Sequence, residues 1–203
     1  HVDLQASLWV EQWDAASPYR PPVFPPMTSP PPTPTVAELV AAALSFPLGT
    51  ALGTDRYHPR TLLRMPTCLL TAMLRIFVLC EILGEWPTAI DGVLIALLPK
   101  AAGGLRPIGI FPTFVRVWFQ LRAPYIRRWE ADHERPYFYA GAAKGADVAL
   151  WLQAAHLEHA ALTQQAAAAT LVDLVKAFER VSHVGLLTAA KRWDYPMWAL
   201  RLS

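Results

Sequence analysis

The stretch TLVDLVKAFERVSH, residues 170–183, contains the residue whose chemistry is easiest to interpret, Asp173. Its carboxylate follows β-favouring residues, and we expect a strand over about residues 169–175 that ends near it. A carboxylate among apolar strand residues is costly to bury unless it has a partner or binds a ligand. Carboxylates held on rigid strands are ligands for hard divalent cations. Phe178 lies five positions beyond Asp173. Aromatic residues usually belong to a core, which is the alternative role for this ring.

A second pair of chemically capable residues, Lys100 and Arg106, flanks a glycine turn. The surrounding stretch DGVLIALLPKAAGGLRPIGIFP has two short β-favouring runs around AAGG, so it predicts an antiparallel hairpin. An ammonium and a planar guanidinium near the tip of one hairpin can together neutralise a polyphosphate. The alternative is a pair of solvated charges on a loop, which contribute little.

Helices are expected on the N-terminal side of this hairpin. Thr35 and Glu38 have the spacing of a capping box, which predicts a helix start before LVAAALSF. Residues 49–66 contain glycine, proline and mixed charge, and they indicate an ordered loop. A long helix follows the loop, and its spacing predicts a buried face made of Leu69, Met73, Phe77 and Cys80.

Helical periodicity returns after the hairpin in TFVRVWFQLRAPYIRRWEAD, where we expect Pro124 to interrupt the helix. Four arginines of this region suit a nucleic-acid backbone and equally a solvated helix face: Arg116, Arg122, Arg127 and Arg128. Another helix is predicted from Ala146, and the residues expected to line one side of it are Leu150, Ala154, Leu157 and Ala161. A last helix is expected after His183. With the strands, these helices define an α+β fold.

The bulk composition limits the classes of function. A formal charge of +2 over 203 residues is too small for a protein whose whole surface grips nucleic acid, so any basic site must be local. Hydrophobic residues make up 54% and charged residues 17%, which indicates that the chain buries surface against something else. The longest apolar stretch, residues 68–83, is interrupted by Arg75 and Glu81 and is too short to span a bilayer, so no membrane partner is expected. The two cysteines lack the spacing of a zinc site or a disulfide framework.

The chain divides by composition into three parts. Residues 1–16 have no assigned structure, residues 17–34 form a Pro-rich linker, and folded structure is expected over residues 35–203. The linker should be extended, because proline fixes φ and removes a backbone donor. It is either a plain spacer or a segment that docks onto an SH3-like partner.

Several motifs in order resemble those of one known family. LLPKAAGGLRPIGIFPTFVRVW, GAAKGADVA and LVDLVKAFERVSH are similar to the successive N-terminal motifs of reverse transcriptases, particularly those of non-LTR retrotransposons and their group II intron relatives. GTDRYHPRTLLRMP resembles the motif that precedes them in the retrotransposon enzymes. The resemblance covers roughly residues 50–192. It implies a right-hand polymerase-like fold, in which residues 35–203 would be the fingers and an incomplete palm, truncated before the aspartate-pair motif.

The same resemblance implies an activity and its partners. Asp173 would be catalytic and would hold Mg²⁺ or Mn²⁺ together with later palm carboxylates, in two-metal nucleotidyl transfer. Lys100 and Arg106 would contact the incoming dNTP, and Phe178 would lie beneath its sugar as a steric gate against the ribose 2′-hydroxyl. The other partners would be an RNA template and a DNA primer, and the location would be nuclear by analogy with retrotransposons.

Two further positions are implied to lie near the template and primer, Lys144 and Gly145. They precede a helix that Asp147 is expected to cap. The sequence departs from the family pattern at Glu179, where aspartate or asparagine is usual, and at Arg56, where glycine is common. The alternatives are a catalytically inactive nucleic-acid-binding remnant and a helical interaction protein that uses its Pro-rich segment.

Overall fold

The computed structural model describes residues 7, 22–27, 31–101, 103–140, 144–170, 172 and 181–203. The chain forms two compact units. Unit 1 comprises His1–Pro21 and Glu130–Leu186, and unit 2 comprises Pro22–Trp129 and Leu187–Ser203. The expected α+β class is confirmed, since helices accompany a two-stranded sheet. No helix within the described ranges is long and apolar enough to cross a membrane.

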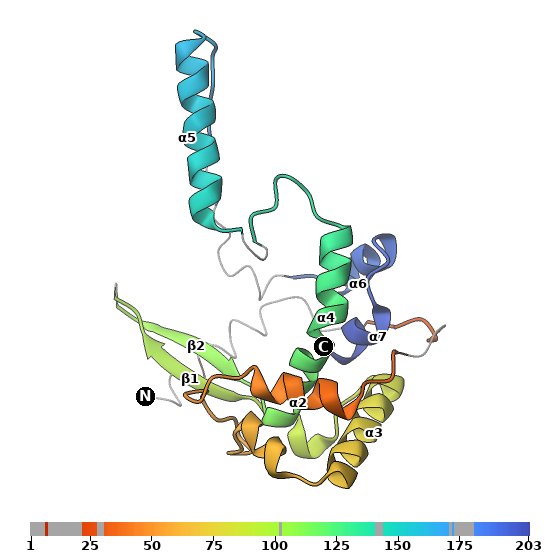
Figure 1. Ribbon diagram of the computed structural model, residues 1–203. Helices are drawn as coiled ribbons and strands as arrows, with labels where there is room; N and C mark the ends of the chain where they lie inside the picture. The colour runs from red at the N-terminus through yellow and green to blue at the C-terminus, as the bar shows by residue number, and fades with distance from the viewer. Residues whose placement is uncertain are drawn as a thin grey trace. The chain divides into compact units, whose positions relative to one another are not determined.

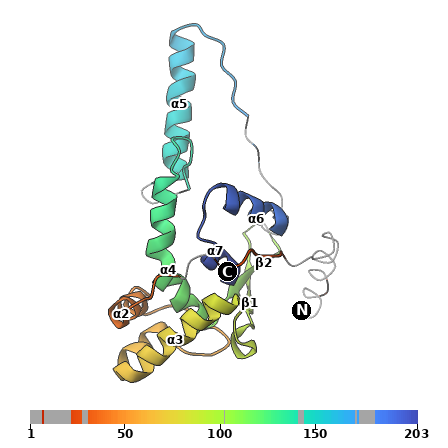
Figure 2. The ribbon, with the colours of Figure 1, turned by 90° about the vertical axis from the view of Figure 1, so that its right-hand side faces the viewer.

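Unit 2 contains the sheet and most of the helices. Its elements in chain order are α2 (Val36–Leu44), the 3₁₀ helix η1 (Pro59–Arg64), α3 (Thr67–Leu83), the 3₁₀ helix η2 (Thr88–Ile90), β1 (Leu94–Pro99), β2 (Leu105–Ile110), most of α4 (Thr113–Asp132), most of α6 (His183–Arg192) and α7 (Met197–Leu202). Figures 1 and 2 show α2 and α3 near the N-terminal end of α4, with the β1–β2 ribbon projecting from this group. Helix α6 begins at His183, as expected.

Helix α2 begins at the predicted capping box. The Thr35 hydroxyl accepts a hydrogen bond from the Glu38 backbone N–H at 3.2 Å, and the Thr35 backbone N–H donates to Glu38 Oε2 at 2.7 Å. This backbone donor, together with the Thr35 hydroxyl, lowers the pKa of the Glu38 carboxyl below its ordinary value. Two otherwise unpaired donors are satisfied, so the helix start is determined locally.

Helix α3 confirms the expected long helix but shifts its buried face. Met73, Phe77 and Cys80 are buried as predicted, whereas Leu69 is 53% exposed. Leu70 and Leu74 are buried instead. The buried residues still follow helical spacing. The buried face of the helix is, however, rotated by about one residue from the face that the sequence pattern predicted.

The hydrophobic core of unit 2 lies between α2, α3, α4 and α7. Phe77 on α3 contacts Phe114 on α4, with ring centroids 4.4 Å apart. Trp86, in the segment after α3, meets the Trp118 ring edge-on at 5.4 Å. The Trp86 indole also donates to the Leu202 carbonyl at 3.0 Å, which ties α7 to this cluster. The core therefore joins segments far apart in the sequence.

A buried ion pair crosses this core. Arg122 donates from Nε and Nη2 to the two carboxylate oxygens of Glu81, at 2.6 and 2.7 Å. Trp118 Nε1 also donates to Glu81 Oε1 at 2.7 Å, and Arg122 Nη1 donates to the Pro32 carbonyl at 2.6 Å. Glu81 and Arg122 are 0% and 1% exposed. Arg122 therefore belongs to the core, so both expectations for it, a nucleic-acid contact and a solvated face, are wrong.

Helix α4 runs without a break through Pro124, contrary to the expected interruption. Proline lacks the N–H that would continue the hydrogen-bond ladder at this position. Leu121 and Arg122, one turn or less before it, are buried, and Arg122 is fixed by Glu81. Tertiary contacts therefore hold the helix across a position that disfavours it locally.

The described residues of the Pro-rich segment are in neither helix nor strand. Pro31 and Pro34 are buried, and the Pro32 carbonyl accepts the bond from Arg122. The end of the segment therefore packs on the core of unit 2 before α2 begins.

Unit 1 contains α5 (Ala146–Leu162), the helix predicted from Ala146. The four residues expected to line one side of it are all exposed in the structure: Leu150, Ala154, Leu157 and Ala161. Ala160 is the one buried residue of α5. A strand was expected over about residues 169–175; within that range Ala169, Thr170 and Val172 are in no strand, and the other positions lie outside the described residues.

Candidate functional site

The β1–β2 hairpin forms where the sequence predicted it. The strands are antiparallel, with Leu98 opposite Arg106 and Pro99 opposite Leu105. The pairing continues one step into the turn, because the Lys100 N–H donates to the Gly104 carbonyl at 3.0 Å. Gly103 closes the turn by donating its N–H to the Lys100 carbonyl, also at 3.0 Å.

The two glycines of this turn have the left-handed backbone that it requires. Gly103 has φ 86° and Gly104 has φ 85°. Side chains other than hydrogen are strained there, although a Cβ at either position would meet open space. The AAGG stretch therefore fixes both the position of the turn and the register of the strands.

The register places Lys100 and Arg106 on the same face of the hairpin. Arg106 lies directly opposite Leu98, and residues directly opposite each other share a face. Side chains alternate along a strand, so Lys100, two residues beyond Leu98, returns to that face. Both side chains are exposed, and within the described ranges neither forms an ion pair or a side-chain hydrogen bond. The hairpin thus presents an ammonium and a guanidinium together.

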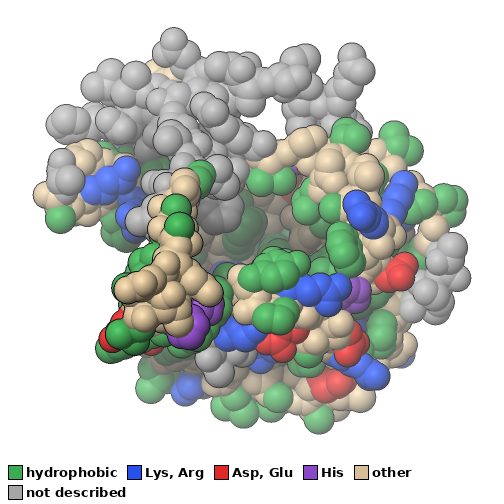
Figure 3. All heavy atoms as spheres, turned by 90° about the horizontal axis from the view of Figure 1, so that it is seen from above, with side chains coloured by type: hydrophobic (Ala, Val, Ile, Leu, Met, Phe, Trp, Pro, Cys, Tyr) green, Lys and Arg blue, Asp and Glu red, His purple; other side chains and the backbone are tan. Residues whose placement is uncertain are grey.

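The rest of the hairpin surface is unusually apolar. Both faces of the ribbon expose large hydrophobic side chains: Leu94, Ile95, Leu98 and Ile108. The space-filling view in Figure 3 shows hydrophobic side chains interspersed with Lys and Arg over the face that it draws. A two-stranded ribbon of this kind rarely persists alone in water, so contact with further surface is expected.

The loop before α3 contains one of the family departures. Arg56 has φ 54°, in the left-handed region that favours glycine. Arg56, a residue with a Cβ, adopts this backbone geometry at a cost. Nothing in the structure explains the arginine.

Lys144 and Gly145 lie together in unit 1, immediately before α5. Lys144 Nζ forms an ion pair with Glu134 Oε1, so its charge is already partnered. Gly145 is the residue that precedes the helix, and it contributes no side-chain cap. The expected capping role of Asp147 is wrong, because the helix begins at Ala146 and places Asp147 in the first turn. There its charge still interacts favourably with the helix dipole.

Asp173 and Phe178, the predicted metal ligand and steric gate, lie outside the described residues, as does Glu179. Among the described residues, no group of three His, Cys, Asp or Glu side chains could hold a metal ion. His156 and His159 are exposed on α5.

The four arginines of the α4 region divide between structure and surface. Arg116 Nη1 donates to the Ala51 carbonyl at 2.6 Å, and its guanidinium lies 5.4 Å from the centre of the Phe46 ring. Arg122 is the buried partner of Glu81. Arg127 and Arg128 are exposed. Two of the four thus stay available to a phosphate backbone.

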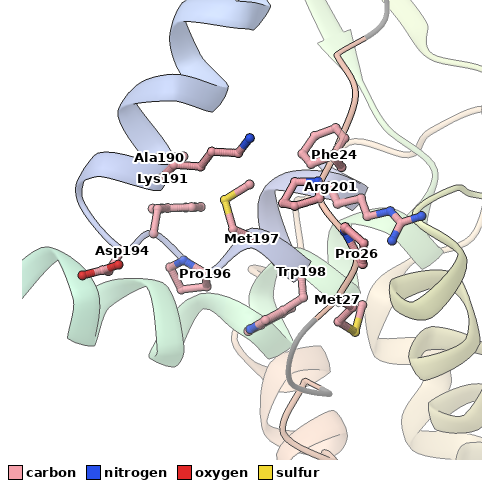
Figure 4. Close-up of a pocket in the computed structure, with 12 residues that line it drawn as sticks. Phe24, Pro26, Met27, Ala190, Lys191, Asp194, Pro196, Met197, Trp198 and Arg201 are labelled. Carbon is pink, nitrogen blue, oxygen red and sulfur yellow. The ribbon is translucent and has the colours of Figure 1, made fainter.

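A separate pocket lies in unit 2 between the Pro-rich segment and the α6–α7 corner (Figure 4). Its volume is about 530 Å³. Phe24 and Met27 line one side, and Lys191, Met197 and Trp198 line the other. Sequence reasoning did not find this pocket, because α7 was not predicted and no local pattern shows where the Pro-rich segment lies.

Comparison of the chain with protein-family models, with curated proteins and with solved structures gives no match.

Proposed function

We propose that this chain contains the fingers and part of the palm of an RNA-directed DNA polymerase similar to those of non-LTR retrotransposons. In this proposal the tip of the β1–β2 hairpin contacts the triphosphate of the incoming nucleotide. The observation that supports it best is the placement of Lys100 and Arg106 on one exposed face, within the stretch that resembles the polymerase motif. Two cations that no described residue neutralises suit a polyphosphate ligand.

The hairpin residues would supply charge neutralisation. Phosphoryl transfer spreads negative charge over the phosphate oxygens, and cations fixed beside those oxygens stabilise the transition state. The planar Arg106 guanidinium suits a two-pronged contact, whereas the Lys100 ammonium acts as a mobile point charge. When bound by Asp173 and further carboxylates, divalent ions would activate the primer hydroxyl and stabilise the leaving oxygen.

The proposal gives Asp173 and Phe178 roles that mutation can separate. In a polymerase that contains this chain and its later palm carboxylates, Asp173→Asn should abolish primer extension, because it keeps the shape but loses the charge. Phe178→Val should retain some synthesis and raise ribonucleotide incorporation, because a smaller side chain admits the 2′-hydroxyl. Lower thermal stability with unchanged sugar preference would instead assign Phe178 to the core.

The second candidate is a nucleic-acid-binding protein without polymerase activity, supported by the exposed Arg127 and Arg128. It predicts RNA–DNA heteroduplex binding that persists without magnesium. A role based on the Pro-rich segment has less support, since Pro31 and Pro34 are buried against the core.

Nucleotide binding by the 203-residue chain tests the main proposal. A fluorescent deoxyribonucleoside triphosphate would be titrated into the wild type, Lys100→Ala and Arg106→Ala. Each variant should bind about 1 to 3 kcal/mol more weakly, with a reduced salt dependence, because a charge-assisted contact is lost. Arg75→Ala is the matched control: Arg75 is exposed on α3 and has no side-chain partner within the described ranges.

Equal nucleotide affinity in the wild type and both hairpin variants would reject the proposal. Lys100 and Arg106 would then be solvated charges on a loop, without a nucleotide contact. Equal weakening by Arg75→Ala would also count against it, because it would show a general charge effect.

A further inference from the structure

The N-terminus of α4 is capped by a residue far away in the sequence. Pro112 immediately precedes the helix and offers no side-chain oxygen, so a local cap is missing. Asp55 Oδ2 instead accepts a hydrogen bond from the Thr113 backbone N–H at 2.6 Å. A carboxylate at this position also interacts favourably with the positive end of the helix dipole.

Two more hydrogen bonds join the first turn of α4 to the same loop, residues 51–57. The buried Thr113 hydroxyl donates to the Tyr57 carbonyl, and Arg116 Nη1 donates to the Ala51 carbonyl at 2.6 Å. The loop is thus fastened at its start, middle and end to the helix that follows the hairpin.

The loop also touches both ends of the hairpin. Thr54 Oγ1 donates to the Gly92 carbonyl, just before β1, across a long 3.4 Å. Gly53 lies against Phe111, just after β2, so closely that a Cβ at Gly53 would be 2.5 Å from the Phe111 carbonyl oxygen. Real Cβ atoms essentially never approach so closely. The segment that follows β2, the strand that contains Arg106, therefore packs directly against Gly53.

From the juxtaposition of residues 51–57 with Gly92, Phe111 and Thr113, we propose that this loop sets the position of the β1–β2 hairpin on α4, with Asp55 as its positioning residue. The inference rests on the proposed nucleotide contact of Lys100 and Arg106. Asp55 does not touch the nucleotide. It fixes the end of the hairpin that adjoins α4, and this determines where Lys100 and Arg106 lie relative to the triphosphate.

Four variants separate positioning from simple stability. Asp55→Ala removes the cap, whereas Asp55→Asn keeps an oxygen acceptor for the Thr113 N–H and should restore binding. Gly53→Ala leaves the cap intact but pushes against the Phe111 carbonyl. Asp91→Ala is the control: it removes an exposed carboxylate near β1 that makes no side-chain hydrogen bond or ion pair within the described part of the chain.

Affinity for a fluorescent deoxyribonucleoside triphosphate would be measured at a temperature where circular dichroism shows each variant folded. We expect Asp55→Ala and Gly53→Ala to weaken binding about five- to tenfold, the effect of misplacing one charge-assisted contact. Asp55→Asn and Asp91→Ala should stay near the wild type. In a Lys100→Ala/Arg106→Ala double background, Asp55→Ala should have little further effect, because neither cation that the loop positions is left.

The outcomes distinguish the two proposals. If Lys100→Ala and Arg106→Ala bind the nucleotide as the wild type does, the proposed nucleotide contact is rejected. The positioning role of Asp55, which depends on that contact, is then rejected too. If those variants bind weakly while both Asp55→Ala and Gly53→Ala bind normally, the hairpin contact stands and the positioning role is overturned. Full additivity of Asp55→Ala with the Lys100→Ala/Arg106→Ala double variant would also overturn it.

Discussion

Helices α3 and α5 have the same length, 17 residues, but very different surroundings. Helix α3 buries six residues in the core of unit 2, whereas α5 buries Ala160 and no other residue. The apolar residues on one side of α3 are covered by α2, α4 and α7 side chains, while others on the same helix, such as Leu69, Leu79 and Leu83, are about half exposed. The apolar residues of α5 are spread around the helix, and Leu150, Trp151 and Leu162 are all strongly exposed.

This difference shows which part of the described chain is stabilised by its own contacts. Unit 2 has an aromatic and aliphatic core, a buried ion pair and a capped first helix. The described part of unit 1 has no comparable core. A helix that is apolar on every side is normally found inside a larger assembly, so α5 is expected to contact surface beyond its own unit.

The largest effect should come from the buried carboxylate of α3. Glu81→Ala leaves Arg122 buried without its partner, which should lower the free energy of unfolding by about 3–5 kcal/mol. Glu158→Ala on α5 is the matched change at an exposed position, and it should cost less than about 0.5 kcal/mol. Urea unfolding monitored by tryptophan fluorescence measures both. Similar losses in the two variants would contradict the contrast between the helices.

A leucine pair tests the apolar part of the same contrast. Leu74→Ala on α3, where the side chain is 7% exposed, should cost about 2–5 kcal/mol through lost burial and a cavity. Leu150→Ala on α5, where the side chain is 62% exposed, should change the free energy of unfolding by less than about 0.5 kcal/mol. A large cost at Leu150 would mean that α5 is covered in solution by the chain itself or by a second copy.

The N-termini of α2 and α5 provide a comparison in which the expected changes in stability are smaller. Thr35→Ala removes the hydroxyl half of the α2 capping box, with its bonds to the Glu38 N–H and carboxylate, and should cost about 1 kcal/mol at pH 7. The pKa of Glu38 is lowered in the folded protein, so its share of the stability is present above the unfolded pKa and is lost as pH falls through the folded pKa. The cost of Thr35→Ala should therefore shrink on acidification. A cost that stays constant down to pH 2 would exclude the Glu38 contribution.

Helix α5 starts at Gly145 without a side-chain cap, so adding one should have the smallest effect. Gly145→Asn should strengthen the first turn by only a few tenths of a kcal/mol, because glycine is itself a tolerated cap and the new Cβ must displace the Asp147 carboxylate, with which it would clash. Hydrogen exchange at the α5 amides measures this. Faster exchange in the variant would contradict the assigned start of the helix.

Local features were predictable from the sequence because their causes are local. The Thr35–Glu38 spacing determines the start of α2, and Gly103 and Gly104 determine the hairpin turn. The same-face placement of Lys100 and Arg106 follows from the strand register, which the turn sets.

Features that depend on distant partners were not predictable. Arg122 looked like a surface cation, because its partner Glu81 lies 41 positions away. The cap of α4 comes from Asp55, 58 positions before Thr113. Pro124 is accommodated by tertiary contacts that outweigh its local preference. Periodicity indicates which residues share one side of α5, but not whether that side is buried, because a helix buries a side only where another element covers it.

The most direct test of the central claim follows the two hairpin cations themselves. Nuclear magnetic resonance of the Lys100 and Arg106 side chains in the 203-residue protein would be recorded while a deoxyribonucleoside triphosphate is added. If both side chains contact the triphosphate, both sets of signals should shift with one common dissociation constant, and those of Arg75 should not. Saturable nucleotide binding with neither hairpin side chain affected would contradict the central claim.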